Sequence, residues 1–226
     1  MTTKARTLVS WSSGKDSAWM LNALQQRGDV ELVGLVTTFN EEAQRVAMHS
    51  VRRELVREQA SAIGLPLYEI MLPWPCSNED YEQCMLDFFD RIEPLSATHF
   101  AFGDLYLEEI RDYRIRQLAK TTLEPLFPVW CSERDTEALA RQMVDSGLRA
   151  VLTCVDTQQL PAEFAGRIFD HSLLDDLPED VDRCGERGEF HSFCFDGPHL
   201  ASPLEFEIGE FEDQGRFVYR DVIAKR

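Results

Sequence analysis

The chain is short of positive charge and of long apolar runs. Its 226 residues contain 23 Lys and Arg against 40 Asp and Glu, which gives a net charge of −17 at pH 7. Tight nucleic-acid binding needs clustered Lys and Arg, so this balance disfavours a nucleic-acid partner. No apolar run reaches the length of a membrane span, and residues 1–6 precede too short an apolar run for a signal peptide. We therefore expect a cytoplasmic protein with no membrane partner.

The cysteines lack the spacing of a metal or redox site. There are six, and no two form a Cys-x-x-Cys pair. We expect reduced thiols that are buried as small hydrophobic groups. The missing pair also disfavours a sulfur-transfer function.

Residues 8–19, Leu-Val-Ser-Trp-Ser-Ser-Gly-Lys-Asp-Ser-Ala-Trp, are the most informative stretch of the chain. The apolar start predicts a short buried strand, residues 12–14 a turn, and residues 15–26 a helix. Unpaired amides and the positive dipole end of the helix both point into such a turn. The pattern therefore predicts an anion site, although a strand followed by a Ser-capped helix is common in any α/β protein.

The side chains of this turn favour a phosphate ligand. Lys15 adds a mobile positive charge, and Ser12, Ser13 and Ser17 supply hydroxyl donors for phosphate oxygens. Asp16 cannot bind a phosphate directly, because like charges repel. We expect Asp16 to hold a divalent cation or to fix the turn.

The turn is neither a Walker A loop nor a dinucleotide fingerprint. Val9 stands five residues before Gly14, Asp16 follows the lysine, and no further glycines follow at the dinucleotide spacing. The turn resembles the PP-loop, Ser-Gly-Gly-x-Asp-Ser, of the N-type ATP pyrophosphatases, which cleave ATP between the α and β phosphates. Ser13 stands where that pattern has its first glycine, so we expect Ser13 to have a negative φ.

The first half of the chain alternates between strand and helix patterns. This alternation predicts an α/β fold with a doubly wound parallel sheet. Strands are predicted at 8–11, 30–39, 67–72 and 98–102, and helices at 15–26, 41–63, 77–92 and 107–122.

Ligands of such sheets bind at the carboxyl ends of the strands. Besides the first turn, this rule selects Thr38 and Asn40 after the second strand, and Gly103 and Asp104 after the fourth. We expect these residues to bind the nucleotide. Trp74, after the third strand, could stack on adenine, but a core or interface aromatic is the simpler interpretation.

The pattern changes after residues 125–130, which we interpret as a linker or crossover because they contain two prolines. We predict a nucleotide domain at 1–128 and a smaller α+β domain at 129–226. The second domain is expected to contain a helix at 135–146, a strand at 150–155, helical pieces at 161–177, a loop at 178–189, a strand at 190–195 and a hairpin of 204–211 with 216–223.

Residues 184–198 form a second cluster of functional side chains. They begin Cys-Gly-Glu-Arg-Gly-Glu-Phe-His-Ser, at a loop-to-strand junction. Glu189 and His191 are two apart, so on a strand they would face the same side. In the functional interpretation, Glu186 or Glu189 orients an amine or ammonia or takes its proton, with His191 assisting. The alternative is an acidic loop that enters a strand.

Other polar residues are open to two interpretations. Arg111 and Arg114 share a helix face and could clamp a phosphate or a substrate carboxylate, or lie on a solvated face. Arg45 and His49 could reach the nucleotide or lie at the surface. Cys184 could be a nucleophile, but no base lies near it in the sequence.

Together these motifs resemble the diphthine–ammonia ligase family. The resemblance rests on the first turn, on Gly-Asp at 103–104 with the two following arginines, on Pro-Leu-Phe-Pro-Val-Trp and on Cys-Gly-Glu-x-Gly-Glu-Phe-His-Ser, and it extends from about residue 8 to 198. It implies an adenine nucleotide alpha hydrolase-like domain followed by a substrate domain. Residues 12–17 would bind the ATP phosphates. On the substrate side the resemblance places Gly103 and Asp104 with the 184–191 segment, including Cys184, Gly185, Glu186 and Glu189, and the two arginines are expected to contact the substrate.

The family implies an amide ligase that uses ATP and Mg²⁺. A carboxylate is activated as an acyl-adenylate, pyrophosphate is released, and ammonia attacks to give an amide. The predicted partners are a small-molecule or protein-bound carboxylate, ammonia and, as an open option, a second copy of the chain. Stand-alone bacterial members carry the same loop, and because bacteria do not make diphthamide, they imply a different carboxylate. Two alternatives remain: a sulfur-transfer or tRNA-modifying PP-loop enzyme, and a non-catalytic ATP sensor.

Overall fold

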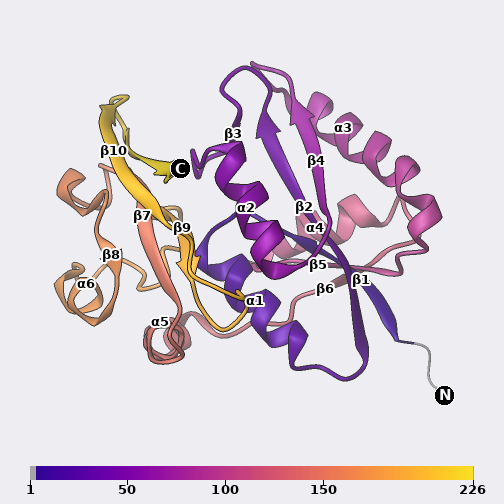
Figure 1. The fold of residues 1–226 in the computed structure, drawn as a ribbon, viewed down its shortest axis with the longest axis horizontal. Helices are drawn as coiled ribbons and strands as arrows, with labels where there is room; N and C mark the ends of the chain where they lie inside the picture. Colours follow the sequence, from indigo (N-terminus) through magenta and orange to yellow (C-terminus); the bar gives the residue numbers. More distant parts are fainter. Residues whose placement is uncertain (1–3, 226) are drawn as a thin grey trace.

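The computed structural model describes residues 4–225 and contains two sheets that pack on shared helices (Figure 1). The first sheet has five parallel strands in the order β4-β2-β1-β5-β6, and the short β3 pairs antiparallel with the end of β2. This largely parallel sheet with flanking helices confirms the predicted α/β class. Its strands are β1 (Ala5–Ser10), β2 (Val30–Asn40), β3 (Arg45–Val46), β4 (Leu67–Leu72), β5 (His99–Ala101) and β6 (Glu124–Leu126).

Four helices cover the two faces of this sheet. Apolar residues of α1 (Lys15–Gln25) and α2 (Arg53–Ile63) belong to the larger hydrophobic cluster, which also contains the core of the second sheet. Apolar residues of α3 (Asn78–Arg91) and α4 (Glu108–Leu118) belong to a separate cluster on the opposite face. A buried core on each face is what a doubly wound sheet requires.

The second sheet is antiparallel and lies beside α1 and α2 (Figure 1). Strand β7 is at its centre and pairs with β8, β9 and β11, while β10 pairs with β11. The remaining elements are β7 (Arg149–Asp156), β8 (Ile168–Phe169), β9 (Phe190–Asp196), β10 (Phe206–Asp213), β11 (Phe217–Ala224), α5 (Thr136–Asp145), α6 (His171–Asp176) and short 3-10 turns at Glu93–Leu95, Glu133–Asp135 and Ala162–Phe164.

Three predicted segments differ from the structure. The helix expected at 41–63 begins only at Arg53, because the Asn40 side chain accepts hydrogen bonds from the amides of residues 42 and 43 and starts a turn that leads into β3. The expected linker at 125–130 begins inside β6, an edge strand that tolerates Pro125. The pieces at 161–177 include β8 as well as helical turns.

Candidate active site

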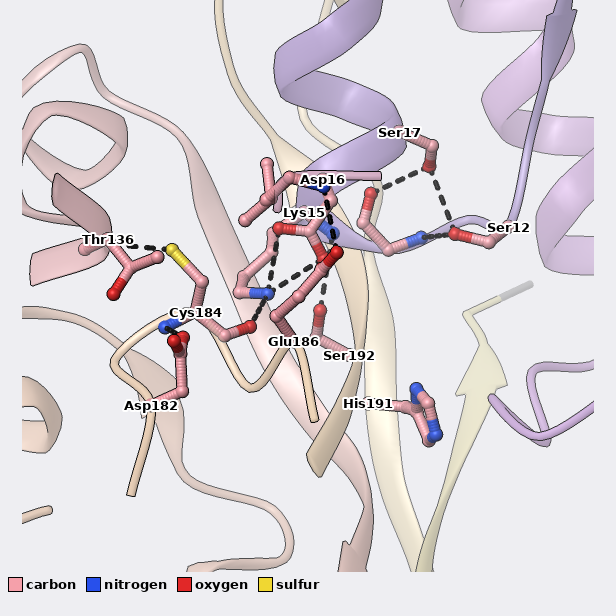
Figure 2. A network of polar contacts seen from close by, with 12 residues as sticks. Ser12, Lys15, Asp16, Ser17, Thr136, Asp182, Cys184, Glu186, His191 and Ser192 are labelled. Atoms are coloured by element: carbon pink, nitrogen blue, oxygen red, sulfur yellow. Dashed lines mark hydrogen bonds and ion pairs between the residues drawn. The ribbon is translucent and has the colours of Figure 1, made fainter. Parts of the chain in front are cut away.

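A cleft of about 320 Å³ opens at the carboxyl ends of β1, β2 and β5, and β9 with its preceding loop forms the opposite wall. Residues more than 160 positions apart in the chain therefore line one space (Figure 2). The predicted site residues that line it are Ser12, Lys15, Asp16, Ser17, Thr38, Gly103, Asp104, Arg114, Gly185, Glu186 and His191.

The turn between β1 and α1 is held by its own serines. The Ser12 hydroxyl donates to Ser17 Oγ at 3.2 Å and accepts from the Gly14 amide at 3.4 Å, while Ser17 Oγ donates to the Gly14 carbonyl at 2.9 Å. Gly14 is the N-cap of α1. Lys15, Asp16 and Ser17, the first residues of α1, line the cleft, so the positive end of the helix dipole lies beside it.

Ser13 has a φ of 69°, so the expected negative φ is wrong. The conformation is stabilised by contacts of the Ser13 carbonyl, which accepts from the Cys194 amide at 2.8 Å and from Gln59 Nε2 at 3.0 Å. The Ser13 side chain is fully buried and does not line the cleft, and within the described part of the chain its Oγ has no hydrogen-bond partner. Ser13 therefore acts through its backbone, which ties the turn to β9.

Lys15 is buried where the two sheets meet. Its Nζ donates to both carboxylate oxygens of Asp16, at 2.9 and 2.8 Å, and to the Cys184 carbonyl (Figure 2). The ammonium also lies 5.2 Å from the centroid of the Phe190 ring. Burial acts most strongly and lowers the pKa of Lys15, but the neighbouring acidic groups, Asp16 first among them, together outweigh it, and the pKa is raised. Lys15 therefore keeps a permanent positive charge at the cleft despite the acidic composition of the chain.

Glu186 faces Lys15 and Asp16 from the loop before β9. Its Oε1 accepts from the Leu105 amide at 2.8 Å. Burial, followed by repulsion from Asp16, raises the pKa of Glu186 to about 8. Glu186 is therefore a carboxyl group that gains or loses a proton near neutral pH, which is the property of a general acid or base.

Two histidines meet at the same wall. The rings of His49 and His191 have centroids 4.7 Å apart, and His49 Nδ1 lies 3.1 Å from the Ser192 carbonyl. A carbonyl only accepts, so Nδ1 carries the proton and Nε2 of a neutral His49 is an acceptor. Burial lowers the pKa of His49, and burial together with His49 lowers that of His191 well below its ordinary value. Both rings are therefore neutral at pH 7.

The loop after β5 belongs to the wall of the cleft that faces β9. A Cβ on Gly103 would lie 3.1 Å from the Asp16 backbone, so this loop and the start of α1 approach closely. Arg114 Nε donates to Asp104 at 3.4 Å, and its guanidinium lies over the Phe102 ring. Burial raises the pKa of Asp104, although Arg114 opposes the rise.

Besides Ser13 and Gly14, which lie in the turn, four predicted site residues do not line the cleft. Asn40 caps the turn after β2, and Arg111 stacks 4.8 Å from the centroid of the Trp130 ring. Glu189 Oε1 accepts from the Asp182 amide, because Glu189 precedes the first residue of β9 and does not follow the alternation of that strand. The Cys184 thiol donates to the Thr136 carbonyl, and burial raises its pKa well above the ordinary value, which disfavours a nucleophile.

Trp74 lies outside the cleft as well. Its side chain is 64% exposed and lines a neighbouring surface groove, which shares Val46, Ala47 and Met48 with the cleft.

His49, Ser192 and Gln117 are among the cleft residues that were not selected from the sequence as site residues. His49 had two open interpretations, and Ser192, whose hydroxyl accepts from the Lys15 amide at 3.2 Å, directly follows His191. Gln117 lines the cleft one helical turn after Arg114. That three-residue spacing is a signal that could have indicated it, because residues three apart share a helix face.

A magnesium ion would need partners besides the protein. Within residues 4–225, no group of three or more His, Cys, Asp or Glu side chains is placed to hold a metal ion. Magnesium in nucleotide enzymes is commonly held by one or two carboxylates together with substrate phosphates. The cleft-lining carboxylates Asp16 and Asp104 fit that arrangement.

None of the helices in the described part of the chain has the length and apolar content needed to cross a bilayer.

The comparisons with known proteins agree with this architecture. The family profile "Diphthamide synthase N-terminal domain" matches residues 5–122, more than half of the chain, and the profile "Diphthamide synthase C-terminal domain" matches residues 135–222. A zebrafish (Danio rerio) protein named diphthine–ammonia ligase is 28% identical in an alignment 223 residues long. The alignment covers 88% of this chain and 85% of that protein. The chain therefore belongs to the diphthamide synthase family and is an enzyme, a nucleotide-binding ligase.

Proposed function

We propose that the chain is an ATP-dependent amide ligase that activates a carboxylate as an acyl-adenylate for attack by ammonia. Residues 1–128 would bind ATP, and residues 129–226 would present the acceptor. One observation carries the proposal: Lys15 and Asp16 at the start of α1 line the same cleft as Glu186 and His191 from the second half of the chain.

The first turn supplies what the ATP phosphates need. Ser12 and Ser17 with their hydroxyls, Lys15 with its charge and the N-terminal end of α1 all line the cleft. Mg²⁺ held by Asp16, with Asp104 as a second carboxylate, would neutralise charge on the leaving pyrophosphate.

The acceptor side supplies proton acceptors. A tetrahedral adduct of ammonia must lose a proton as the C–N bond forms and AMP leaves. Glu186 in its ionised form can accept that proton, and His191, whose lowered pKa makes its neutral ring the weaker base, would assist. The raised pKa of Glu186 makes it a stronger base than an ordinary carboxylate once it is ionised.

The alternatives receive less support. Sulfur transfer would need a reactive thiol, and no cysteine lines the cleft in the described part of the chain. A tRNA-modifying enzyme would bind tRNA with an affinity that falls steeply with salt. A non-catalytic sensor would bind ATP tightly without turnover in the presence of carboxylates and ammonium.

The test is a screen of small-molecule and protein-bound carboxylates with ATP, Mg²⁺ and ammonium. The readout is the formation of AMP and pyrophosphate. Lys15→Met and Glu186→Gln should each lower turnover by about 100-fold or more, the usual loss when a charge-stabilising group is removed. Lys120→Met is the matched control, because Lys120 pairs with Glu82 at the surface and should leave turnover unchanged.

Formation of ADP and phosphate in place of AMP and pyrophosphate would rule out adenylation. Full turnover of the Lys15 and Glu186 variants on a true substrate would show that the site is assigned to the wrong residues.

A further inference from the structure

The cleft has a second, apolar part on the α3–α4 side of the parallel sheet. Val36, Met85, Phe100 and Phe102 line it, and none of these side chains is more than 4% exposed. The rings of Phe100 and Phe102 lie with their centroids 4.7 Å apart. We call these four residues the apolar pouch. Nothing in it suits a phosphate, but its aromatic and aliphatic surfaces suit the face of a flat, weakly polar ring.

Gln117 brings an unpaired amide group to this part of the cleft. Both its Oε1 and its Nε2 are buried, and neither has a hydrogen-bond partner among residues 4–225. Buried amides are almost always hydrogen-bonded, because burying an unpaired polar group is unfavourable. Gln59, which is fully buried next to the turn of the site, makes three hydrogen bonds by comparison. The unpaired state of Gln117 therefore points to a ligand that completes it.

The neighbouring charged group does not compete for this role. Arg114, one turn before Gln117 on α4, is paired with Asp104 and lies over the Phe102 ring. The Gln117 side chain therefore keeps a donor group, the Nε2 amide, and an acceptor, Oε1, free for a ligand. A side-chain amide of this kind pairs with adenine through two hydrogen bonds, since adenine offers the N6 amino donor beside the N7 acceptor.

We propose that the apolar pouch binds the adenine base and that Gln117 reads its N6–N7 edge. Guanine and hypoxanthine present two acceptors there, O6 and N7, so the amide oxygen would face an acceptor and one hydrogen bond would be lost. Gln117 therefore selects ATP over GTP and ITP. The inference rests on the proposed function, which places the phosphates at the Ser12–Ser17 end of the same cleft.

The experiment measures nucleotide dissociation constants by calorimetry. The ligands are ATP, ITP and 7-deaza-ATP, which lacks the N7 acceptor, and the proteins are the wild type, Gln117→Met and Lys15→Met. Wild type should bind ATP about 10- to 100-fold more tightly than ITP, the usual range for a lost bidentate pair. Gln117→Met should bind all three with similar, weaker affinity, whereas Lys15→Met should weaken all three by a common factor. The melting temperature of ligand-free Gln117→Met should equal or exceed that of wild type.

Equal affinity of the wild type for ATP, ITP and 7-deaza-ATP would overturn the inference and leave the proposed function intact. This measurement uses only the wild type, so it does not depend on whether a variant folds. Retained discrimination in Gln117→Met would do the same. If the wild type binds none of the three nucleotides, the proposed function fails and the inference fails with it.

Discussion

Replacing Ser13 with glycine should stabilise the protein, although the residue lies in the turn of the site. Ser13 combines two unfavourable features: a φ of 69°, and a buried hydroxyl without a hydrogen-bond partner. Ser13→Gly removes both. It keeps the carbonyl that accepts from Cys194 and Gln59, because those bonds involve only the backbone of residue 13.

The magnitude follows from three contributions. A left-handed φ in a residue with a Cβ costs about 1–2 kcal/mol, and a buried unpaired hydroxyl about 1–3 kcal/mol. Glycine adds freedom to the unfolded chain, which opposes the gain by about 0.5–1 kcal/mol. We expect a net stabilisation of about 1–4.5 kcal/mol, which for a chain of this size raises the melting temperature by roughly 2–18 °C.

Differential scanning calorimetry of three variants separates the contributions. Ser13→Ala keeps the Cβ and loses only the hydroxyl, so its melting temperature should fall between those of wild type and Ser13→Gly. Ser12→Gly is the matched control and should be destabilised, because the Ser12 hydroxyl is hydrogen-bonded to Ser17 and Gly14. If Ser13→Gly melts at or below the wild-type temperature, the strain and the unpaired hydroxyl do not have the energies assigned to them.

Two further predictions concern the residues around Lys15. Gly14→Ala should lower the melting temperature and weaken ATP binding, because its Cβ would lie 2.8 Å from the His49 ring and 3.0 Å from the Ser192 carbonyl; an unchanged calorimetric profile would contradict this close approach. Glu186→Gln should flatten the pH dependence of stability: a carboxyl whose pKa is raised from 4.5 to about 8 stabilises the folded state fully below pH 4.5 and loses that contribution as pH rises through 8. Melting temperatures of wild type and Glu186→Gln should therefore diverge in slope between pH 5 and 9, and parallel curves would show that Glu186 titrates normally.

Helices and strands were predictable where the hydrophobic periodicity extended over many residues and nearby residues marked where the element begins and ends. The strand expected at 67–72 is β4, with the same bounds. The helix expected at 77–92 is α3, which begins with a complete capping box between Ser77 and Asp80. The helix prediction for residues 41–52 was wrong because Gln44, Met48 and Ser50 all have positive φ, and no residue type there signals a left-handed backbone.

The candidate site was predictable to the extent that strand ends determine it. The carboxyl-end rule selects the first turn, Thr38 and the Gly103–Asp104 pair, and all of them are at one edge of the sheet. Asn40 was selected by the same rule and Glu189 by the alternation of a strand, but each accepts hydrogen bonds from nearby backbone amides and does not line the cleft. Such local partners depend on the exact path of the loop, which composition and spacing do not determine.

Gln59 and Gln117 illustrate what no sequence pattern contains, namely whether a buried amide has partners. Gln59 is fully buried; its Oε1 accepts from the Trp11 indole at 2.9 Å, and its Nε2 donates to the carbonyls of Ser13 at 3.0 Å and Cys194 at 2.7 Å. It therefore connects α2 to the end of β1, to the turn of the site and to β9. Gln117 has the same chemistry and makes none of these bonds within the protein.

The same substitution at both positions should therefore have opposite effects. Gln59→Met fills a similar volume but leaves the Trp11 indole and two carbonyls with fewer partners, so we expect a loss of about 2–5 kcal/mol in the free energy of unfolding. Gln117→Met removes an unpaired amide and should leave that free energy unchanged or raise it. Urea unfolding of the two variants, without nucleotide, measures both values directly. Equal destabilisation of the two variants would mean that the amide of Gln117 stabilises the folded protein itself. Its position would then be explained without a ligand, and the inference that it binds adenine would lose its basis.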